Sequence, residues 1–195
     1  MKQKSQHHGH HGTLNYQIPP QWRNWLLDER SLTLRLQQRA REDFHVELLG
    51  QRFSRPNANE ARRLALPQRQ LVLMRQVCLY CDGVAVVLAH SLIPLATLHG
   101  SLRRLKYLAN RPLGAALFAY PQLRRSAFEI IQLSRSELPH YFHLAPTHPL
   151  LRSLQSEQLW GRRSHFQLGD KAVLVSEIFL PSLTELPNRG NLAAS

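Results

Sequence analysis

The chain of 195 residues has only two cysteines, no long hydrophobic run and no apolar segment near its N-terminus. Two cysteines do not make the disulfide framework of a small secreted protein. A membrane-spanning helix needs roughly 20 apolar residues. A secretory signal needs an apolar core, and the N-terminal stretch MKQKSQHHGHHGTLNYQ contains none. We therefore expect a reduced, cytoplasmic protein without a membrane span.

Acidic residues are also scarce, since 13 aspartates and glutamates stand against 25 lysines and arginines, for a net charge of +12. Such an excess is typical of a nucleic-acid-binding surface, or of a solvated basic surface with a few arginines that face an anionic small molecule. The basic residues are spread along the chain, without zinc-finger spacing or a glycine-flanked aromatic strand motif. This distribution favours the small anion, and we expect no nucleic-acid partner.

Metal and redox chemistry find little support. Cys78 and Cys81 have CxxC spacing, but the first lies within a predicted strand, whereas functional CxxC motifs lie on turns or at helix starts. Four histidines between residues 7 and 11 could bind a transition metal, yet a defined site needs ligands in fixed geometry. We therefore expect no metal site.

A hydrophobic content of 43% over this length predicts one domain with a real core. Composition divides the chain into a flexible His-rich leader over residues 1–18, a folded domain over 19–181 and a loose tail over 182–195.

The stretch from residue 70 to 94 organises the domain. It predicts two apolar strands joined at Asp82-Gly83, a pair that tolerates the positive φ of a two-residue turn. Alternation places Arg75 in one row with Leu71, Leu73, Val77 and Leu79. A buried guanidinium needs an anion beside it, supplied by a protein carboxylate or by a ligand. With a two-residue turn, His90 would lie opposite Arg75.

Hydrophobic periodicity predicts the other elements. Helices are expected after Pro19-Pro20, after the N-cap candidate Ser31 and over 97–108. Residues 54–69 are expected to form a loop with a short helix, and 136–156 an irregular or helical excursion. The remaining strands are expected over 44–53, 126–134, 159–168 and 171–180. The fold class is therefore α+β, with a single six-stranded antiparallel sheet and helices packed against it.

The last strand contains the second unusual charge. Glu177 shares an apolar row with Val173, Val175 and Phe179, and it lies opposite Arg162 if Gly169-Asp170 is a two-residue turn. Two interpretations stay open. Glu177 is a structural partner of Arg75 or Arg162, or it faces a ligand.

Five stretches, in the same order along the chain, resemble the chorismate pyruvate-lyase family. They are WLLDERSLTLRL (25–36), MRQVCLYCDG (74–83), SLIP (91–94), RPLGAALF (111–118) and WGRRS (160–164) followed by SEIFLP (176–181). Residues 136–156 look like an insertion relative to shorter members, and Leu32 stands where the family often has methionine.

The resemblance implies conversion of chorismate to 4-hydroxybenzoate and pyruvate, the first committed step of ubiquinone synthesis, without a metal or cofactor. It implies a catalytic domain over 19–181 whose helical flaps enclose a buried ligand. We expect the protein to be a monomer. Arg75 and Glu177 would contact the ligand through their side chains, and Leu32 and Leu113 through main-chain groups. Arg75 would bind a carboxylate, and Glu177 would bind the 4-hydroxyl or help move the proton lost from that carbon. Arg162 and Arg163 are candidates for the second carboxylate.

An alternative is a ligand sensor, since the effector-binding domain of GntR-type regulators is similar in fold. Such regulators carry an N-terminal winged helix, and we expect the roughly twenty residues before Trp22 to be too few for one.

Overall fold

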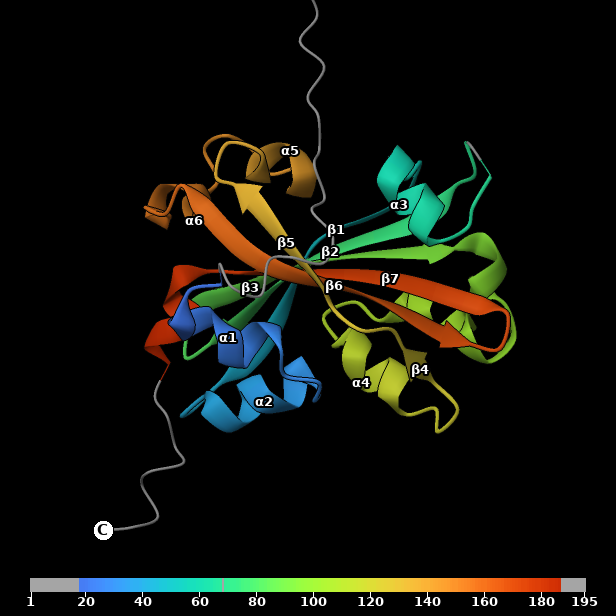
Figure 1. Ribbon diagram of the computed structural model, residues 1–195, viewed down its shortest axis with the longest axis horizontal. Coiled ribbons are helices and arrows are strands. Elements are labelled where there is room, and N and C mark those ends of the chain that lie inside the picture. The colour runs from blue at the N-terminus through green and yellow to red at the C-terminus, as the bar shows by residue number, and fades with distance from the viewer. Residues whose placement is uncertain (1–17, 68, 187–195) are drawn as a thin grey trace, which may run out of the picture.

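The computed structural model describes residues 18–67 and 69–186, which form an α+β fold around one antiparallel sheet (Figure 1). The sheet order is β1-β2-β3-β7-β6-β4, and β5 also pairs with β6. The strands are β1 (Phe44–Ser54), β2 (Val72–Cys81), β3 (Val84–Pro94), β4 (Arg124–Arg125), β5 (Glu129–Ser134), β6 (Gln158–Leu168) and β7 (Lys171–Phe179).

The sheet has seven strands rather than the predicted six, because a two-residue strand, β4, precedes β5, the strand that forms within the predicted range 126–134. Ser126 lies between them. Its backbone N–H donates to the His165 carbonyl, and its hydroxyl accepts from the His165 N–H. This side-chain hydrogen bond substitutes for one bond of the ladder and interrupts the strand.

The helices cover both faces of the sheet. α1, α2 and α4 lie on one side in Figure 1, and α3, α5 and α6 on the other. Their bounds are α1 (Pro20–Leu26), α2 (Leu32–Arg39), α3 (Ala58–Arg63), α4 (Leu113–Phe118), α5 (Leu138–Phe142) and α6 (Pro149–Ser153). The predicted cap is confirmed, since the Ser31 hydroxyl accepts from the Leu34 N–H. The short helix within 54–69 and the helical excursion within 136–156 are confirmed as well.

The helix predicted over 97–108 is instead two 3₁₀ segments, η2 (Leu95–Leu98) and η3 (Gly100–Tyr107). His99 is extended and Gly100 has φ +59°, so a continuous α-helix cannot form there. The leucine pattern still predicted burial correctly, because Leu98, Leu102, Leu105 and Leu108 all lie in the core.

The central hairpin forms as predicted, with Asp82 and Gly83 at φ 51° and 76°. Its register differs, because a β-bulge between Leu79 and Tyr80 in the pairing with β3 shifts the partners by one residue. Arg75 is therefore opposite Ser91, and His90 is opposite Gln76. A one-residue shift moves a side chain to the other face of the sheet, so the expectation that His90 lies beside Arg75 is wrong.

Packed structure continues beyond the boundaries expected from composition. Ile18 is buried against α1, and η4 (Pro181–Glu185) places Leu183 fully in the core. The loose tail expected over 182–195 is therefore corrected for residues 182–186. Residues 1–17 and 187–195 lie outside the described chain.

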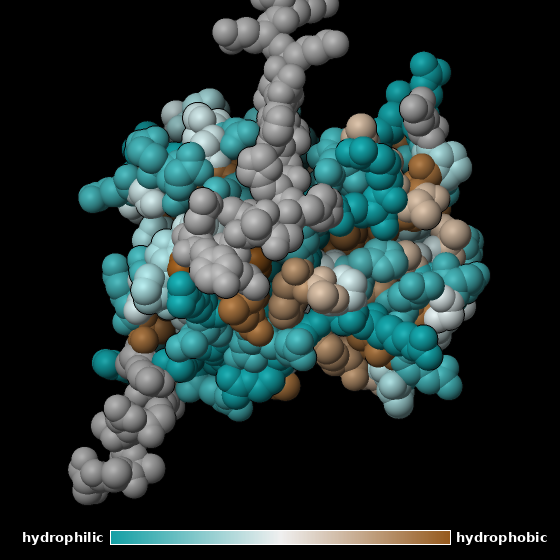
Figure 2. All heavy atoms as spheres, in the orientation of Figure 1, coloured by the Kyte–Doolittle hydropathy of each residue, from teal (hydrophilic) through white to brown (hydrophobic). Residues whose placement is uncertain are grey.

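The core lies on both faces of the sheet, under the helices. Hydrophilic residues predominate on the face seen in Figure 2, with hydrophobic groups in separate patches. Within the described residues, no helix has the length and apolar character needed to span a membrane.

Candidate functional site

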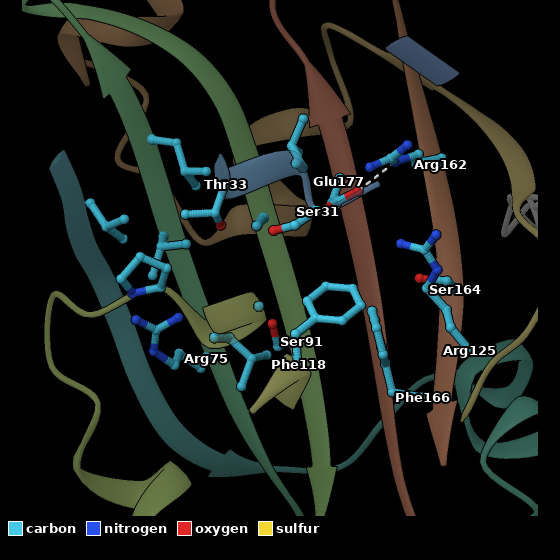
Figure 3. A pocket seen from close by; sticks show the side chains of 18 residues that line it. Ser31, Thr33, Arg75, Ser91, Phe118, Arg125, Arg162, Ser164, Phe166 and Glu177 are labelled. Atoms are coloured by element: carbon cyan, nitrogen blue, oxygen red, sulfur yellow. Dashed lines mark hydrogen bonds and ion pairs between the residues drawn. The ribbon is translucent and has the colours of Figure 1, made fainter. Parts of the chain in front are cut away.

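A cavity of about 50 Å³ lies between the sheet and the N-terminal ends of α2 and α4 (Figure 3). It separates two hydrophobic clusters, one built around α1 and α2 and the other around η3 and α4. Residues from β2, β3, β6 and β7 form its floor. Its polar lining consists of Ser31, Thr33, Arg75, Ser91, Arg125, Arg162, Ser164 and Glu177.

Arg75 faces this cavity from β2 and is only 1% exposed. Its Nη2 donates to the carbonyls of Ala109 and Arg111, at 2.8 and 2.9 Å. Ala109 has φ 45°, an unusual conformation for a residue other than glycine. Among the described residues Arg75 has no carboxylate partner, and its Nε has no hydrogen-bond partner. Burial lowers the pKa of Arg75 to about 10.

Glu177 pairs with Arg162 and not with Arg75. The predicted register is confirmed, and Arg162 Nε donates to Glu177 Oε2 at 2.6 Å. Arg162 Nη1 also donates to the carbonyls of Trp25 and Asp28, at 3.0 and 2.6 Å. Arg162 is thus held by α1 and the segment after it, and it fixes one oxygen of Glu177 at the cavity wall.

Leu32 and Leu113 are the first residues of α2 and α4, and both line the cavity. The first N–H groups of a helix have no partner within it. Two helices therefore begin at the cavity lined by Arg75 and Glu177, and their first main-chain N–H groups lie near it. The structure brings together five of the six candidate site residues that the sequence singled out, namely Arg75, Glu177, Arg162, Leu32 and Leu113.

Arg163 lies elsewhere. Side chains alternate along β6, so Arg163 points to the face opposite Arg162. Its Nε donates to Ser176 Oγ at 3.0 Å, and its Nη1 donates to Asn59 Oδ1 at 2.8 Å. It does not line the cavity.

Sequence reasoning missed Arg125, which lines the cavity beside Arg162. Its guanidinium lies over three aromatic rings, with centroid distances of 4.5 Å to Phe128, 5.7 Å to Phe118 and 6.0 Å to Phe166. Its Nη2 donates to the carbonyl of Glu29. Burial and the nearby charge of Arg162 lower the pKa of Arg125. The sequence held no signal for it, because Arg125 precedes the periodic pattern that predicted the strand.

Both cysteines are buried free thiols. Burial raises the pKa of Cys78 to about 12 and that of Cys81 to about 11, which disfavours the reactive thiolate. In the described part of the chain, no group of three or more histidine, cysteine and acidic side chains could hold a metal ion. The histidines between residues 7 and 11 lie outside that part.

Solved structures share this fold of an antiparallel sheet covered by helices. PhnF from Mycobacterium smegmatis is 13% identical, with a TM-score of 0.53, and the match covers 80% of this chain and 66% of that one. The ligand-binding domain of a putative GntR-family regulator from Bordetella bronchiseptica is 18% identical, with a TM-score of 0.51, over 72% of this chain and 86% of that one. At these identities the likeness establishes the fold alone.

The sequence gives a narrower assignment. The model of the chorismate lyase family matches residues 12–186. A probable chorismate pyruvate-lyase of Methylobacillus flagellatus is 46% identical over 85% of this chain and 90% of that protein. Another, from Marinobacter nauticus, is 44% identical over 86% of this chain and 80% of that protein. This chain belongs to the chorismate lyase family.

Proposed function

We propose that this protein is a chorismate pyruvate-lyase, which converts chorismate to 4-hydroxybenzoate and pyruvate without a cofactor. The observation that carries the proposal is Arg75, a fully buried guanidinium with no carboxylate partner among the described residues, in the same cavity as Glu177. A buried cation is costly unless it is paired. A carboxylate ligand would supply the pairing, in a chain whose relatives bear the name of chorismate lyases.

In this mechanism Arg75 binds the ring carboxylate. Its Nη2 donates to two carbonyls, whereas its Nε has no partner among the described residues. Nε can therefore donate a charge-assisted hydrogen bond to the ligand. The main-chain N–H groups of Leu32 and Leu113 add donors at the helix starts. Together they would fix the ring in one orientation.

Glu177 is placed to interact with the 4-hydroxyl and with the hydrogen on that carbon. Arg162 holds its Oε2, and Oε1 is the oxygen left for the ligand. In the reaction the ether bond at ring C3 breaks and the hydrogen at C4 is lost as the ring becomes aromatic. The departing enolpyruvyl group gains one proton at its methylene carbon and leaves as pyruvate. Aromatisation drives the reaction, and the protein orients the side chain and stabilises separating charge.

Ligand binding requires movement, because the cavity of about 50 Å³ is far smaller than the roughly 300–1,000 Å³ typical of ligand pockets. The segments that close it are the beginnings of α2 and α4. We take these as the flaps. Phe118, which is 44% exposed, lies at the end of α4 and lines the cavity.

Incubation of the purified full chain with chorismate, without added metal, tests the activity. Equal amounts of 4-hydroxybenzoate and pyruvate are expected, measured by chromatography and by a lactate dehydrogenase assay. Tight binding of chorismate without product would contradict the proposal and favour the second candidate, a ligand-sensing domain. Only the fold shared with the GntR-family structures supports that candidate.

We also propose that the protein acts as a cytoplasmic monomer without a nucleic-acid partner. Gel filtration with light scattering would test its mass, and a filter-binding assay with DNA and RNA at physiological salt would test the last point.

A further inference from the structure

We propose that Arg125 binds the second carboxylate of the substrate, the one carried by the enolpyruvyl group. The inference rests on the proposed function and assigns a role to a residue that neither the sequence pattern nor the family resemblance singled out. Chorismate is a dianion whose two carboxylates project from different positions of the ring. A complementary site therefore needs two separate cationic groups.

The charges that line the cavity fit a dianion. Three arginines, Arg75, Arg125 and Arg162, and one acidic residue, Glu177, give a net charge of +2. Arg162 and Glu177 neutralise each other at 2.6 Å. The two remaining positive charges belong to Arg75 and Arg125, and neither forms an ion pair with another described residue.

The surroundings of Arg125 are those of a ligand-binding guanidinium. Its side chain is half-buried, and its Nη2 donates to the Glu29 carbonyl. Phe128 lies against both Arg125 and Arg162, with guanidinium-to-ring distances of 4.5 and 4.1 Å. Aromatic faces hold the guanidinium in place and leave its edge, which carries the N–H donors, for an anion.

Arg162 and Arg163 are poorer candidates for this role. Arg162 already donates from Nε and Nη1 to Glu177, Trp25 and Asp28. Arg163 points to the other face of the sheet, where it contacts Asn59 and Ser176. Two of the three nitrogens of Arg162 are thus already engaged, and Arg163 does not line the cavity.

The order of the groups across the sheet also fits the ligand. Arg75 is on β2 and Arg125 on β4, at opposite sides of the cavity, and Glu177 on β7 lies between them (Figure 3). In chorismate, the carbon with the hydroxyl adjoins the carbon with the enolpyruvyl ether. With the ring carboxylate at Arg75, the hydroxyl would reach Glu177 and the enolpyruvyl carboxylate would reach Arg125.

This assignment separates substrate from product. 4-Hydroxybenzoate keeps the ring carboxylate and the hydroxyl but has lost the enolpyruvyl group. Arg125 should therefore matter for chorismate and hardly at all for 4-hydroxybenzoate, whereas Arg75 should matter for both. A residue with a purely structural role would affect the two ligands alike.

The test compares Arg125→Gln and Arg125→Lys with the control Arg124→Gln. Arg124 is the exposed neighbour on β4, pairs with Gln167 and does not line the cavity. For Arg125→Gln we expect kcat/KM for chorismate to fall about 10- to 100-fold, the range for a lost charge-assisted contact. The Kd for 4-hydroxybenzoate should change less than about threefold. Arg125→Lys should recover part of the loss, and Arg124→Gln should behave as wild type.

A second measurement needs no variant. The stable aromatic dicarboxylate 3-(1-carboxyvinyloxy)benzoate should bind the wild-type protein at least about tenfold more tightly than its side-chain methyl ester. Equal binding would overturn the inference, as would normal kcat/KM in Arg125→Gln or an equal loss for chorismate and 4-hydroxybenzoate. Failure of the wild-type protein to turn over chorismate would count against the proposed function instead.

Discussion

Arg75 is a buried cation stabilised by two backbone carbonyls and by no carboxylate among the described residues. Its replacement by alanine leaves those carbonyls without their donor, which costs roughly 1–3 kcal/mol each at most, but it also removes an unpaired buried charge. We expect Arg75→Ala to fold, with turnover of chorismate and binding of 4-hydroxybenzoate severely reduced. Steady-state kinetics, ligand titration and thermal unfolding measure the three effects.

Arg111→Ala is the matched control for Arg75→Ala. Arg111 is exposed and contributes its backbone carbonyl to Arg75, so the truncation keeps that contact. It should retain activity. Near-normal activity of Arg75→Ala together with a lowered melting temperature would show that Arg75 is structural.

Glu177→Gln separates the two interpretations of this residue. Loss of one partner of a buried ion pair typically costs about 3–5 kcal/mol. Glu177 is 19% exposed, an amide keeps an acceptor for Arg162 Nε, and Arg162 retains its two carbonyls. We therefore expect a stable variant that binds 4-hydroxybenzoate more weakly. Its turnover should fall at least about tenfold and up to the 10²–10⁴-fold typical of acid–base catalysis.

Glu129→Gln is the control for Glu177→Gln. Glu129 forms a similar ion pair with Arg63, at 2.6 Å and 14% exposure, away from the cavity. Like Glu177→Gln it should remain stable, but its turnover should be unchanged. If Glu177→Gln were strongly destabilised and its folded fraction turned over chorismate normally, the catalytic role would be wrong.

Asp28 gives a pH-dependent contribution to stability. Its carboxylate binds Arg30 at 2.7 Å and Arg35 at 2.9 Å, and the hydrogen bond from Arg30 is the main cause that lowers its pKa to about 2. The folded pKa is below the unfolded value near 3.9, so this stability is present above about pH 4 and is lost as the pH falls toward 2.

We expect Asp28→Asn to lose about 1–2 kcal/mol at pH 7, discounted because Arg30 is exposed. The difference from wild type should shrink as the pH falls below 4. Urea unfolding at pH 7, 4 and 3 would measure this, and a difference that grows on acidification would contradict the sign.

At the scale of elements, the β6–β7 hairpin depends on Gly161. A Cβ at this position would lie 2.6 Å from the Glu177 carbonyl oxygen and 2.7 Å from Ile178 Cδ1. The backbone contact cannot be relieved by a side-chain rotation, so β6 would have to move away from β7. Since Arg162 follows directly, the shift would disturb its pairing with Glu177.

We expect Gly161→Ala to cost about 1–3 kcal/mol and to lower turnover. Gly50→Ala in β1 is the control, because a Cβ at Gly50 meets nothing within 4 Å. Chemical denaturation and kinetics on both variants test this, and equal stability of the two would rule out the proposed close packing.

The sequence was most informative about elements with local signals. Alternation and turn residues predicted both hairpins, and the Arg162–Glu177 pairing followed from a two-residue turn. The bulge beside Tyr80 has no such signal, and it moved His90 to the other face. The 3₁₀ segments around Gly100 and the interruption at Ser126 likewise depend on tertiary contacts that periodicity cannot reveal.

At the scale of the molecule, the sheet separates two groups of polar side chains, one on each face of its central strands. Each polar cavity residue on the central strands has a sequence neighbour whose side chain points to the opposite face. The neighbours are Gln76 beside Arg75, His90 beside Ser91, Arg163 beside Arg162 and Ser176 beside Glu177. There Gln76 Nε2 contacts His90 Nδ1 at 3.0 Å, and Arg163 contacts Ser176. These hydrogen bonds join β2 to β3 and β6 to β7 behind the cavity. Sequence alternation indicated which residues share a face, but the sheet order that brings β2 near β7 came only from the structure.

Activity of the whole chain should not depend on a metal. The groups assigned to catalysis are an arginine, a glutamate and main-chain donors, and the chemistry gains its driving force from aromatisation. The histidines between residues 7 and 11 are the clustered ligands in the sequence, and they lie outside the described residues.

We expect full turnover of chorismate after exhaustive chelation and dialysis. A variant with these four histidines changed to alanine serves as the control and should match wild type with and without chelator. Loss of turnover in chelator that zinc or magnesium restores would show that a metal takes part, and a loss confined to the wild-type chain would place that metal on these histidines.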